Sequence, residues 1–315
     1  MGVIAITGAS GFIGQHLVKF LSNNDKGQIR VLVHQNSNVD TFNRPNVAIL
    51  EGDLSKAETL QRLIEPGCTV VNLVYLWGRS REENLEAIDN LANVCAKAKV
   101  KRMIHCSTAV VVGDVQDNLI DEETICNPIE EYETTKLEIE ELLLWKYGYL
   151  FELVILRPTA VFGRNGKNLI KVANDLLSQP PFITSLKASL FYKRRLNLVC
   201  VENVVSAILF LMQINDQMDG ERFIISDDDE IENNYYDIIN LLASQFGHKP
   251  AKAFYMPYRY HILRMLLTAS KKSNVNAHRN YSSNKLFSLG FKRSIQFHEG
   301  VRLFAKWYHQ SIFQN

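Results

Sequence analysis

Short apolar runs alternate with stretches of helical periodicity over about the first 165 residues of the chain. The runs are nearly uninterrupted, which is typical of strands that are buried on both faces of a sheet. Between the runs, apolar residues recur every three or four positions, as at Ile13, Leu17, Phe20 and Leu21, which indicates amphipathic helices. We predict strands at 3–7, 29–34, 47–50, 68–74, 102–106 and 153–156.

The helices predicted between these strands carry start signals. Phe12 opens the first helix, directly after a glycine-rich turn. Ser55 and Ser80 are each followed three residues later by Glu, the spacing of a capping box, and Asn127 with Pro128 forms an N-cap and first-turn pair. Strands and helices that alternate in this way form right-handed βαβ units. We therefore predict an α/β fold with a Rossmann-like doubly wound parallel sheet.

The alternation weakens in the second half of the chain. We expect residues 164–195 to be irregular, and residues 196–201 to form a strand that rejoins the sheet and leads into a helix ending near Gln213. Later helices are predicted near 235–246 and 298–309, whereas 248–295 is basic and aromatic without a clear period.

These patterns predict two domains. The sheet domain is expected to comprise residues 1–165 plus about 192–225. The remainder, 166–191 and about 226–315, is too weakly periodic to form a large core of its own. We expect it to be a smaller mixed α/β C-terminal substrate domain.

Composition and charge narrow the functional classes. Of 315 residues, 46% are hydrophobic and 22% are charged, which supports a folded interior and excludes a disordered or collagen-like chain. The formal net charge of +1 gives no bulk reason to expect nucleic acid as a partner, and no apolar run is long enough to predict a transmembrane segment. The five Cys have no CxxC spacing, and no export signal is recognised. We therefore expect a reduced, cytoplasmic protein without a metal site.

Gly8, Gly11 and Gly14 lie between the first predicted strand and the first predicted helix. A tight turn there requires a residue without Cβ, and glycine also lets the backbone approach a pyrophosphate closely. Because the start of the helix offers free N–H groups to phosphates, this spacing at this place predicts a dinucleotide site.

The end of the second predicted strand bears on the choice of dinucleotide. Sites for NAD usually carry an acid there that accepts from the ribose 2′-OH, whereas this strand ends in His34 followed by Gln35, Asn36 and Ser37. His34, Ser37 and Ser10 could donate to a 2′-phosphate, so NADP is favoured over NAD. The alternative is a strand end that is simply solvated.

Asp53 follows the third predicted strand. A carboxylate there can accept from an adenine amino group, and we expect this role for Asp53. The nearby Ser55 leaves open the alternative that Asp53 caps the next helix.

Two Tyr-x-x-x-Lys pairs occur, Tyr132/Lys136 and Tyr281/Lys285, and chance alone predicts about one. The first pair lies one turn apart on a predicted helix between two buried strands, whereas the second lies outside any βαβ unit and is interpreted as structural. Thr108 follows the preceding strand, at the edge where such sheets bind ligands. This set suits proton transfer at a carbinol oxygen during hydride transfer. Lys136 would favour the phenolate of Tyr132, and Thr108 would orient the substrate oxygen.

In their order and spacing, the segments TGASGFIG, GDL, CST, YETTK and LRPTAVFG resemble those of the extended short-chain dehydrogenase/reductases of the NAD-dependent epimerase/dehydratase type. The resemblance implies an NAD(P)-dependent enzyme in which Thr108, Tyr132 and Lys136 are catalytic. It also implies a homodimer, with helices 81–99 and 130–147 at the seam. The implied cofactor-binding residues are Gly8, Ser10, Gly11, Phe12, Ile13, Gly14, His34, Asp53, Leu54, Val74, Lys136 and Pro158.

Three places depart from the family pattern. Val74 and Tyr75 replace two small residues after the fourth strand and would narrow the cofactor groove. Val112 replaces a Tyr, and Glu131 replaces a Pro before Tyr132. A carboxylate close to the phenol would raise the pKa of Tyr132.

The resemblance implies a nucleotide-linked sugar as substrate, on which the chain would act as a 4-epimerase or 4-ketoreductase. The diphosphate of such a substrate requires cations, and we expect Arg194 or Arg195 to bind it. An apolar carbonyl compound is left open instead, as in sterol- and flavonoid-reducing relatives, with residues 254–258 and 261–267 lining its pocket. The alternative, which we favour, is that these two segments form the core of the small domain. Residues 261–272, apolar and ending in two lysines, leave open contact with a membrane surface. A non-catalytic NAD(P)-binding regulator is the third alternative.

Overall fold

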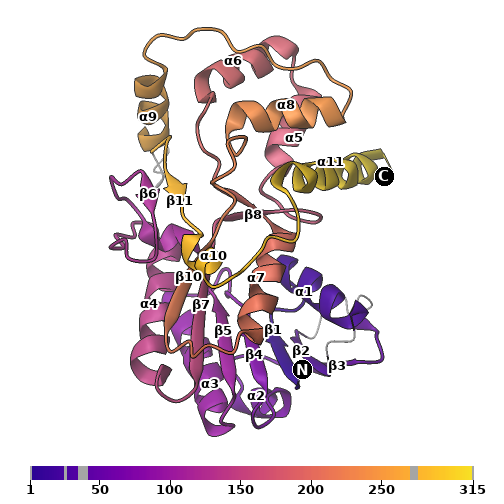
Figure 1. The fold of residues 1–315 in the computed structure, drawn as a ribbon, viewed down its shortest axis with the longest axis vertical. Helices are drawn as coiled ribbons and strands as arrows, with labels where there is room; N and C mark the ends of the chain where they lie inside the picture. Colours follow the sequence, from indigo (N-terminus) through magenta and orange to yellow (C-terminus); the bar gives the residue numbers. More distant parts are fainter. Residues whose placement is uncertain (1, 25–26, 35–41, 270–275, 314–315) are drawn as a thin grey trace. The chain divides into compact units, whose positions relative to one another are not determined.

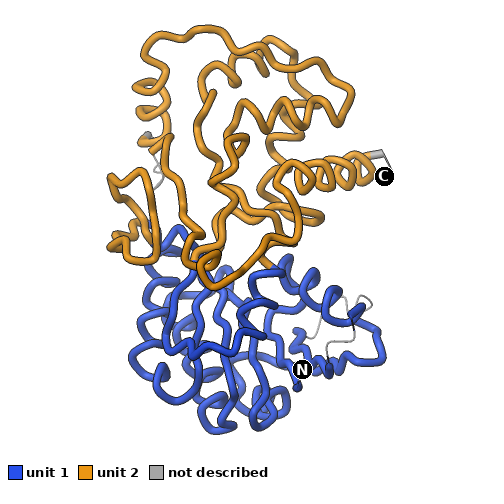
Figure 2. Tube along the Cα trace, in the orientation of Figure 1, with its two compact units in different colours: residues 1–111, 130–157, 205–223 blue, residues 112–129, 158–204, 224–315 orange. Residues whose placement is uncertain are grey.

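The computed structural model describes residues 2–24, 27–34, 42–269 and 276–313. The chain forms two compact units, each built from three segments (Figure 2). The first unit comprises residues 1–111, 130–157 and 205–223, and the second comprises 112–129, 158–204 and 224–315. Ser37, Lys271 and Lys272, to which roles were assigned above, lie outside the described residues.

The first unit is organised by a seven-stranded sheet with the order β10-β7-β5-β4-β1-β2-β3 (Figure 1). From β7 to β3, neighbouring strands pair in parallel. The strand order reverses between β1 and β4, which confirms the predicted Rossmann-like doubly wound α/β fold. The strands are β1 (Ile4–Thr7), β2 (Ile29–Val33), β3 (Val47–Glu51), β4 (Thr69–Asn72), β5 (Arg102–Cys106), β7 (Glu152–Pro158) and β10 (Glu221–Ile225).

All six strands predicted from apolar runs are present in this sheet. Strands β1 and β5 are buried at every residue, as expected for strands covered on both faces. The seventh strand, β10, was not predicted, because the charged residues Glu221 and Arg222 interrupt its apolar pattern.

The helices of the first unit pack their apolar residues against the sheet. Helices α2, α3 and α4 bury Leu60, Leu91 and Leu143 in one cluster with the strand residues Ala5 and Met103. This cluster holds α4, the helix of the predicted catalytic pair, on the sheet. The helices that connect these strands are α1 (Phe12–Asn23), α2 (Ala57–Leu63), α3 (Arg81–Lys97), α4 (Glu131–Tyr147) and α7 (Val201–Gln213).

The start of α3 confirms a predicted capping box. The Ser80 hydroxyl accepts from the Glu83 N–H, and the Glu83 carboxylate accepts from the Ser80 N–H. The capping box predicted for α2 is wrong, because Lys56 is its N-cap and the Ser55 N–H donates to Asp53 instead.

The predicted start of α4 at Asn127 and Pro128 is also wrong. The helix begins at Glu131, with Glu130 as its N-cap. Asn127 forms a β-bridge with Gly113, which keeps its backbone extended and delays the helix.

The second unit contains two short parallel strand pairs and a group of helices (Figure 1). Strand β8 (Ala160–Phe162) pairs with β9 (Leu198–Cys200), and β6 (Leu119–Ile120) pairs with β11 (Asn280–Tyr281). A 3-10 turn, η2 (Ala109–Val112), precedes β6 and contains the point in the sequence where the first unit ends and the second begins. Phe162, Leu242 and Phe304 are in the apolar cluster of this unit. Its helices are α5 (Ile170–Ser178), α6 (Pro181–Phe191), α8 (Tyr235–Gln245), α9 (Arg259–Ala269), α10 (Asn284–Ser288) and α11 (Phe297–Phe313).

Two sequence predictions for this unit are wrong. Residues 164–195 are not irregular, since they contain α5 and α6. Pro180 and Pro181 lie between the two helices, and Pro181 is the first residue of α6. The strand expected at 196–201 is present as β9, but it pairs with β8 and does not rejoin the seven-stranded sheet. An apolar run identifies a buried strand without specifying its partner.

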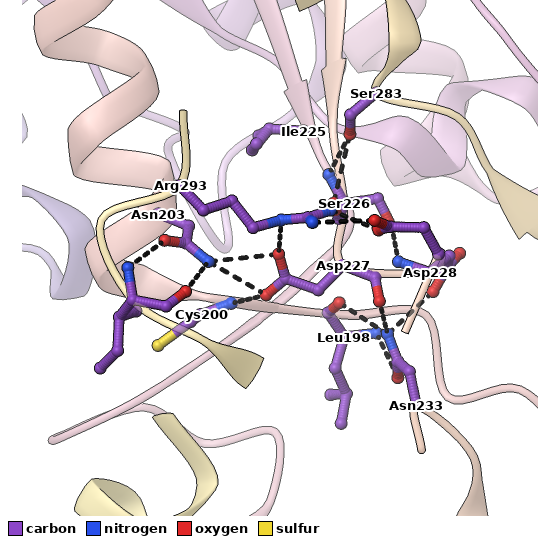
Figure 3. A network of polar contacts seen from close by, with 12 residues as sticks. Leu198, Cys200, Asn203, Ile225, Ser226, Asp227, Asp228, Asn233, Ser283 and Arg293 are labelled. Atoms are coloured by element: carbon purple, nitrogen blue, oxygen red, sulfur yellow. Dashed lines mark hydrogen bonds and ion pairs between the residues drawn. The ribbon is translucent and has the colours of Figure 1, made fainter. Parts of the chain in front are cut away.

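A buried polar network joins the loop after β10 to other segments of the second unit (Figure 3). Asp227 accepts from the Cys200 N–H at 3.0 Å and pairs with Arg293 at 2.7 Å. Asp228 accepts from the Tyr281 N–H at 2.8 Å. Burial raises the pKa of Asp227 to about 6 and the pKa of Asp228 to about 7. These two carboxylates therefore tie together β9, β11 and the loop after β10.

Candidate functional site

The turn between β1 and α1 has the geometry expected of its glycines. Gly8 has φ +76°, and a Cβ on Gly14 would lie 2.2 Å from the Gly8 carbonyl oxygen. Gly11 is the N-cap of α1, and no side chain of the described residues caps the helix. The first N–H groups of α1 are thus available to an anion such as a pyrophosphate, and a side chain at position 14 would clash with the backbone of the turn that forms this cradle.

A cleft of about 500 Å³ lies in the first unit, at the carboxyl ends of β1, β2, β3 and β4. Its position is the strand-order reversal at which doubly wound sheets bind ligands. Lys136 and Pro158 do not line this cleft; Lys136 lies on α4 and Pro158 ends β7. The predicted cofactor residues that line it are Gly8, Ser10, His34, Asp53, Leu54 and Val74, while Gly11, Phe12, Ile13 and Gly14 form the adjoining turn and the start of α1.

His34 and Asp53 line the cleft at the ends of two adjacent strands, β2 and β3. His34 is exposed. Asp53 Oδ1 accepts from the Ser55 N–H at 2.9 Å, and this hydrogen bond lowers the pKa of Asp53. Asp53 is therefore an ionised acceptor that holds the turn before α2 and lines the cleft. The alternative that it caps α2 is wrong, because Lys56 is the N-cap and no side chain in the described part of the chain caps that helix.

Tyr132, in the first turn of α4, is enclosed by two aromatic residues of the loop after β4. Trp77 stacks on its ring with 4.9 Å between centroids and 17° between planes, and Tyr75 meets the ring edge-on at 4.9 Å. Burial is the largest cause of a raised pKa of Tyr132, and a hydrogen bond with Thr108 opposes it. Tyr132 is therefore protonated at neutral pH. Glu131, expected to perturb this phenol, is exposed.

Lys136 is buried one turn after Tyr132. Its ammonium donates to the Cys106 carbonyl oxygen at 3.0 Å and lies 5.4 Å from the centroid of the Tyr75 ring. Burial lowers the pKa of Lys136, and nearby Glu140 opposes that shift. Because Cys106 ends β5 and Thr108 follows it, Lys136 links α4 to the strand end that carries Thr108. The three residues predicted to be catalytic are thus neighbours in the first unit.

A buried ion pair fixes α4 against β7. Glu140, one turn after Lys136, accepts from Arg157 Nε at 3.0 Å and 3.1 Å through its two carboxylate oxygens. Glu140 is fully buried and Arg157 nearly so. The pair orients the helix face that carries the candidate catalytic residues.

Sequence reasoning missed a chain of polar side chains across the strand ends. Thr7 Oγ1 donates to Asn72 Oδ1 at 2.7 Å, and the Asn72 amide lies 2.9 Å from His105 Nδ1. Burial lowers the pKa of His105, so the ring is neutral. A polar residue at or near the last position of three apolar strands was the available signal. Trp77 was missed as well, because nothing in the sequence pairs it with Tyr132.

The cations predicted to bind a diphosphate belong to the second unit. Arg195 donates to the Glu230 carbonyl oxygen at 2.8 Å, and Lys193 pairs with Asp237 at 2.6 Å. Burial lowers the pKa of Arg194. Arg195 and Lys193 therefore also act as structural ties within this unit. Tyr281, interpreted as structural, is buried in β11.

Comparisons with known proteins add independent findings. The family model described as the NAD dependent epimerase/dehydratase family matches residues 4–226. The chain is 25% identical to a decarboxylating sterol-4-alpha-carboxylate 3-dehydrogenase of Candida albicans. The match extends over 245 residues, 71% of this chain and 70% of that protein. It is 26% identical over 188 residues to an uncharacterized UDP-glucose epimerase of Bacillus subtilis, which covers 51% of this chain and 57% of that protein.

The fold has solved counterparts. The crystal structure of UDP-glucuronic acid 4-epimerase from Bacillus cereus, in complex with NAD, matches with a TM-score of 0.72 and 17% identity, over 99% of this chain and 99% of that chain. At this identity, the likeness shows a shared fold alone.

Proposed function

The chain belongs to the NAD dependent epimerase/dehydratase family, and we propose that it transfers a hydride between NAD(P) and a carbinol or carbonyl carbon of its substrate. The observation that carries this proposal is the cluster of Thr108, Tyr132 and Lys136 in the unit that also holds the glycine turn and its cleft. An intact cluster favours an enzyme over a non-catalytic regulator.

Bound NAD(P) would supply or accept the hydride. The phosphates would lie on the glycine turn at the start of α1, and Asp53 would accept from the adenine amino group. Tyr132 would exchange a proton with the substrate oxygen, which Thr108 would orient. With its raised pKa, the phenol is a proton donor, which suits reduction of a carbonyl. For the reverse direction, the Lys136 ammonium one turn away would stabilise the phenolate.

NADP is the form of the cofactor that we favour. His34 lines the cleft directly after β2, where an acid would otherwise accept from the ribose 2′-OH. A 2′-phosphate there would meet an imidazole and the helix start instead of a carboxylate. The structure of the B. cereus epimerase contains NAD. The affinities of this protein for NAD and for NADP are therefore to be measured side by side.

The first candidate substrate is a nucleotide-linked sugar, on which the chain would act as a 4-epimerase or 4-ketoreductase. The family and the two sugar epimerases named above support this class. Arg194 or Arg195 would bind the diphosphate. Arg195 and Lys193 already have protein partners, so these cations would not serve the substrate alone.

The second candidate is an apolar secondary alcohol or ketone, such as a sterol. The aromatic side chains of Tyr75 and Trp77 beside Tyr132 support it, because an apolar substrate could pack against these rings. The C. albicans relative, named as a sterol dehydrogenase, supports the same class.

The test compares the parent protein with Tyr132→Phe and with Tyr149→Phe as a matched control, since Tyr149 is exposed just after α4. We expect Tyr132→Phe to abolish hydride transfer while the affinity for NAD(P) stays nearly unchanged, and Tyr149→Phe to retain full turnover. Reduced nicotinamide is followed by absorbance with a 3-hydroxysterol as probe. Interconversion of UDP-glucose and UDP-galactose is followed by chromatography, because an epimerase leaves no net change in reduced nicotinamide. Turnover that survives Tyr132→Phe would contradict the catalytic assignment.

The cofactor carried by the purified protein separates the two reaction types. Tightly held NAD, released on denaturation, favours an epimerase, which returns the hydride to the same substrate. An empty site that takes up NADPH favours a reductase.

A further inference from the structure

Exposed apolar side chains gather on the segment that contains α9, in the second unit. Tyr255 is 86% exposed, Tyr258 78% and Met265 65%, and Phe254, Ile262 and Leu266 are exposed as well. We call these six side chains the α9 surface. Large apolar side chains exposed together on a folded protein mark an interaction site.

The exposed residues of α9 form a stripe. Ile262, Met265 and Leu266 have the spacing i, i+3, i+4, so they share one helix face. Of the described side chains of α9, only Leu263 is buried. Leu263, with the half-buried Leu267, therefore anchors the helix in the second unit, and its other described apolar side chains face solvent.

The same region has an unusual charge. Between residues 238 and 298 the sequence contains ten Lys and Arg and no Asp or Glu, although the whole chain has a net charge of only +1. The remaining residues therefore carry a net negative charge. Lys252 and Arg264 are exposed within this region, and the Arg259 guanidinium lies 4.8 Å from the centroid of the Tyr260 ring.

We propose that the α9 surface binds the interface of an anionic phospholipid bilayer. Ile262, Met265 and Leu266 would enter the boundary between headgroups and acyl chains, and Tyr255 and Tyr258 would lie at headgroup depth. Lys252 and Arg264 would be attracted to the negative lipid headgroups. None of the helices in the described part of the chain is apolar and long enough to cross a membrane, so this contact is peripheral.

Charge complementarity favours lipid over two other occupants. A second copy of the chain, joined through the same surface, would bring the exposed cations Lys252 and Arg264 of the two copies together, and their like charges would repel. A nucleic acid would satisfy the cations but would leave Ile262 and Met265 without an apolar partner.

This proposal is independent of the proposed function, because it uses neither the cleft nor Tyr132. It is tested on the full-length protein by co-sedimentation with vesicles of phosphatidylcholine alone and of phosphatidylcholine mixed with phosphatidylserine. We expect binding to the mixed vesicles that weakens as salt is raised, and little binding to phosphatidylcholine alone.

Two double variants separate the apolar and the charged contributions. Ile262→Ser/Met265→Ser and Lys252→Glu/Arg264→Glu should each weaken binding to the mixed vesicles about tenfold or more. The matched controls are Ile125→Ser/Ile231→Ser and Lys101→Glu/Lys171→Glu, which change exposed residues elsewhere and should bind like the parent. Unchanged circular dichroism confirms that each variant folds.

Three results would overturn the proposal. The first is no binding of the parent to the mixed vesicles. The second is equal loss in the α9 variants and in their controls. The third is vesicle binding that is lost in Lys252→Glu/Arg264→Glu but kept in Ile262→Ser/Met265→Ser, with equal affinity of the parent for single-stranded DNA. The surface would then be a general site for polyanions.

Discussion

The Trp77 ring lies against the Tyr132 ring even though 73% of the Trp77 side chain remains exposed to solvent. An exposed tryptophan that stacks on a phenol shields it from water on one face. Since burial is the main reason that the pKa of Tyr132 is raised, Trp77 contributes to keeping the phenol protonated. Trp77 is thus a positioning residue in the proposed reaction, acting through Tyr132.

Trp77→Ala should lower the pKa of Tyr132 toward its ordinary value, because water gains access to the phenol. In Trp77→Ala, the pH at which turnover changes with ionisation of Tyr132 should be lower than in the parent protein. In Trp77→Phe, that pH should stay near the parent value, because a ring is retained. Trp145→Ala, at another exposed tryptophan, is the control. The pH dependence of turnover is the measurement, and a profile that Trp77→Ala leaves in place would show that the stack does not govern the phenol.

Residues differ in how far their roles can be predicted from the sequence. Tyr132, Lys136 and Thr108 could be singled out because spacing and strand ends define where they must lie. Trp77 could not, because its partner Tyr132 comes from a segment distant in sequence. Asn72 carried a signal as the polar last residue of an apolar strand, but its contact with His105 is made only in the folded sheet. The approach of Lys136 to the Cys106 carbonyl was likewise invisible to spacing arguments.

Helix α4 is held in place by a buried ion pair as well as by its apolar face. Glu140 and Arg157 are both buried, and Arg222 lies 3.6 Å from the same carboxylate. Removing one partner of such a pair leaves an uncompensated charge in a low-dielectric interior. The stability of the first unit and the orientation of Lys136 therefore depend on the same contact.

Glu140→Gln should lower the free energy of unfolding by about 3–5 kcal/mol, because Arg157 would lose its charged partner. Glu141→Gln, at the exposed neighbouring position of the same helix, should change it by less than about 0.5 kcal/mol. Urea denaturation followed by circular dichroism measures both. Equal stability of the two variants would mean that water or other groups solvate Arg157.

At the level of elements, the buried parallel strands were predictable because an uninterrupted apolar run has few other structures open to it. The later helices were not. Pro180 and Pro181 suggested irregularity, yet they separate two helices. Helix α9 was not identified because its apolar residues, 262–263 and 265–267, are nearly continuous and obscure the helical period. Strand β9 was predictable as a strand, but its partner β8 was not, since pairing is decided by tertiary packing.

For the molecule as a whole, the network around Asp227 and Asp228 links stability to pH. Both carboxyls have folded-state pKa values, about 6 and about 7, above their usual 3.8. The folded protein therefore holds these two protons more tightly than the unfolded chain does. Their contribution to stability is fully present below about pH 4 and is lost as the pH rises through 6 and 7.

Asp228→Asn should flatten this dependence. One pKa unit corresponds to about 1.4 kcal/mol, so the Asp228 contribution changes by a few kcal/mol between pH 4 and pH 8. The variant is expected to be less stable than the parent at low pH, since it loses hydrogen bonds, but to change less with pH. Asp117→Asn, at an exposed position of the same unit, should keep the parent slope. Urea denaturation across this range decides, and an unchanged slope in Asp228→Asn would falsify the link.

The interleaving of the two units has a consequence for how the chain is made. The polypeptide passes from one unit to the other after residues 111, 129, 157, 204 and 223. On a ribosome, the first unit has all its segments only once residue 223 has been synthesised, and the second must wait for the last segment, 224–315. By then the two earlier pieces of the second unit, 112–129 and 158–204, have emerged without the partners that bury them. A nascent chain of this kind presents its greatest demand for chaperones late in translation.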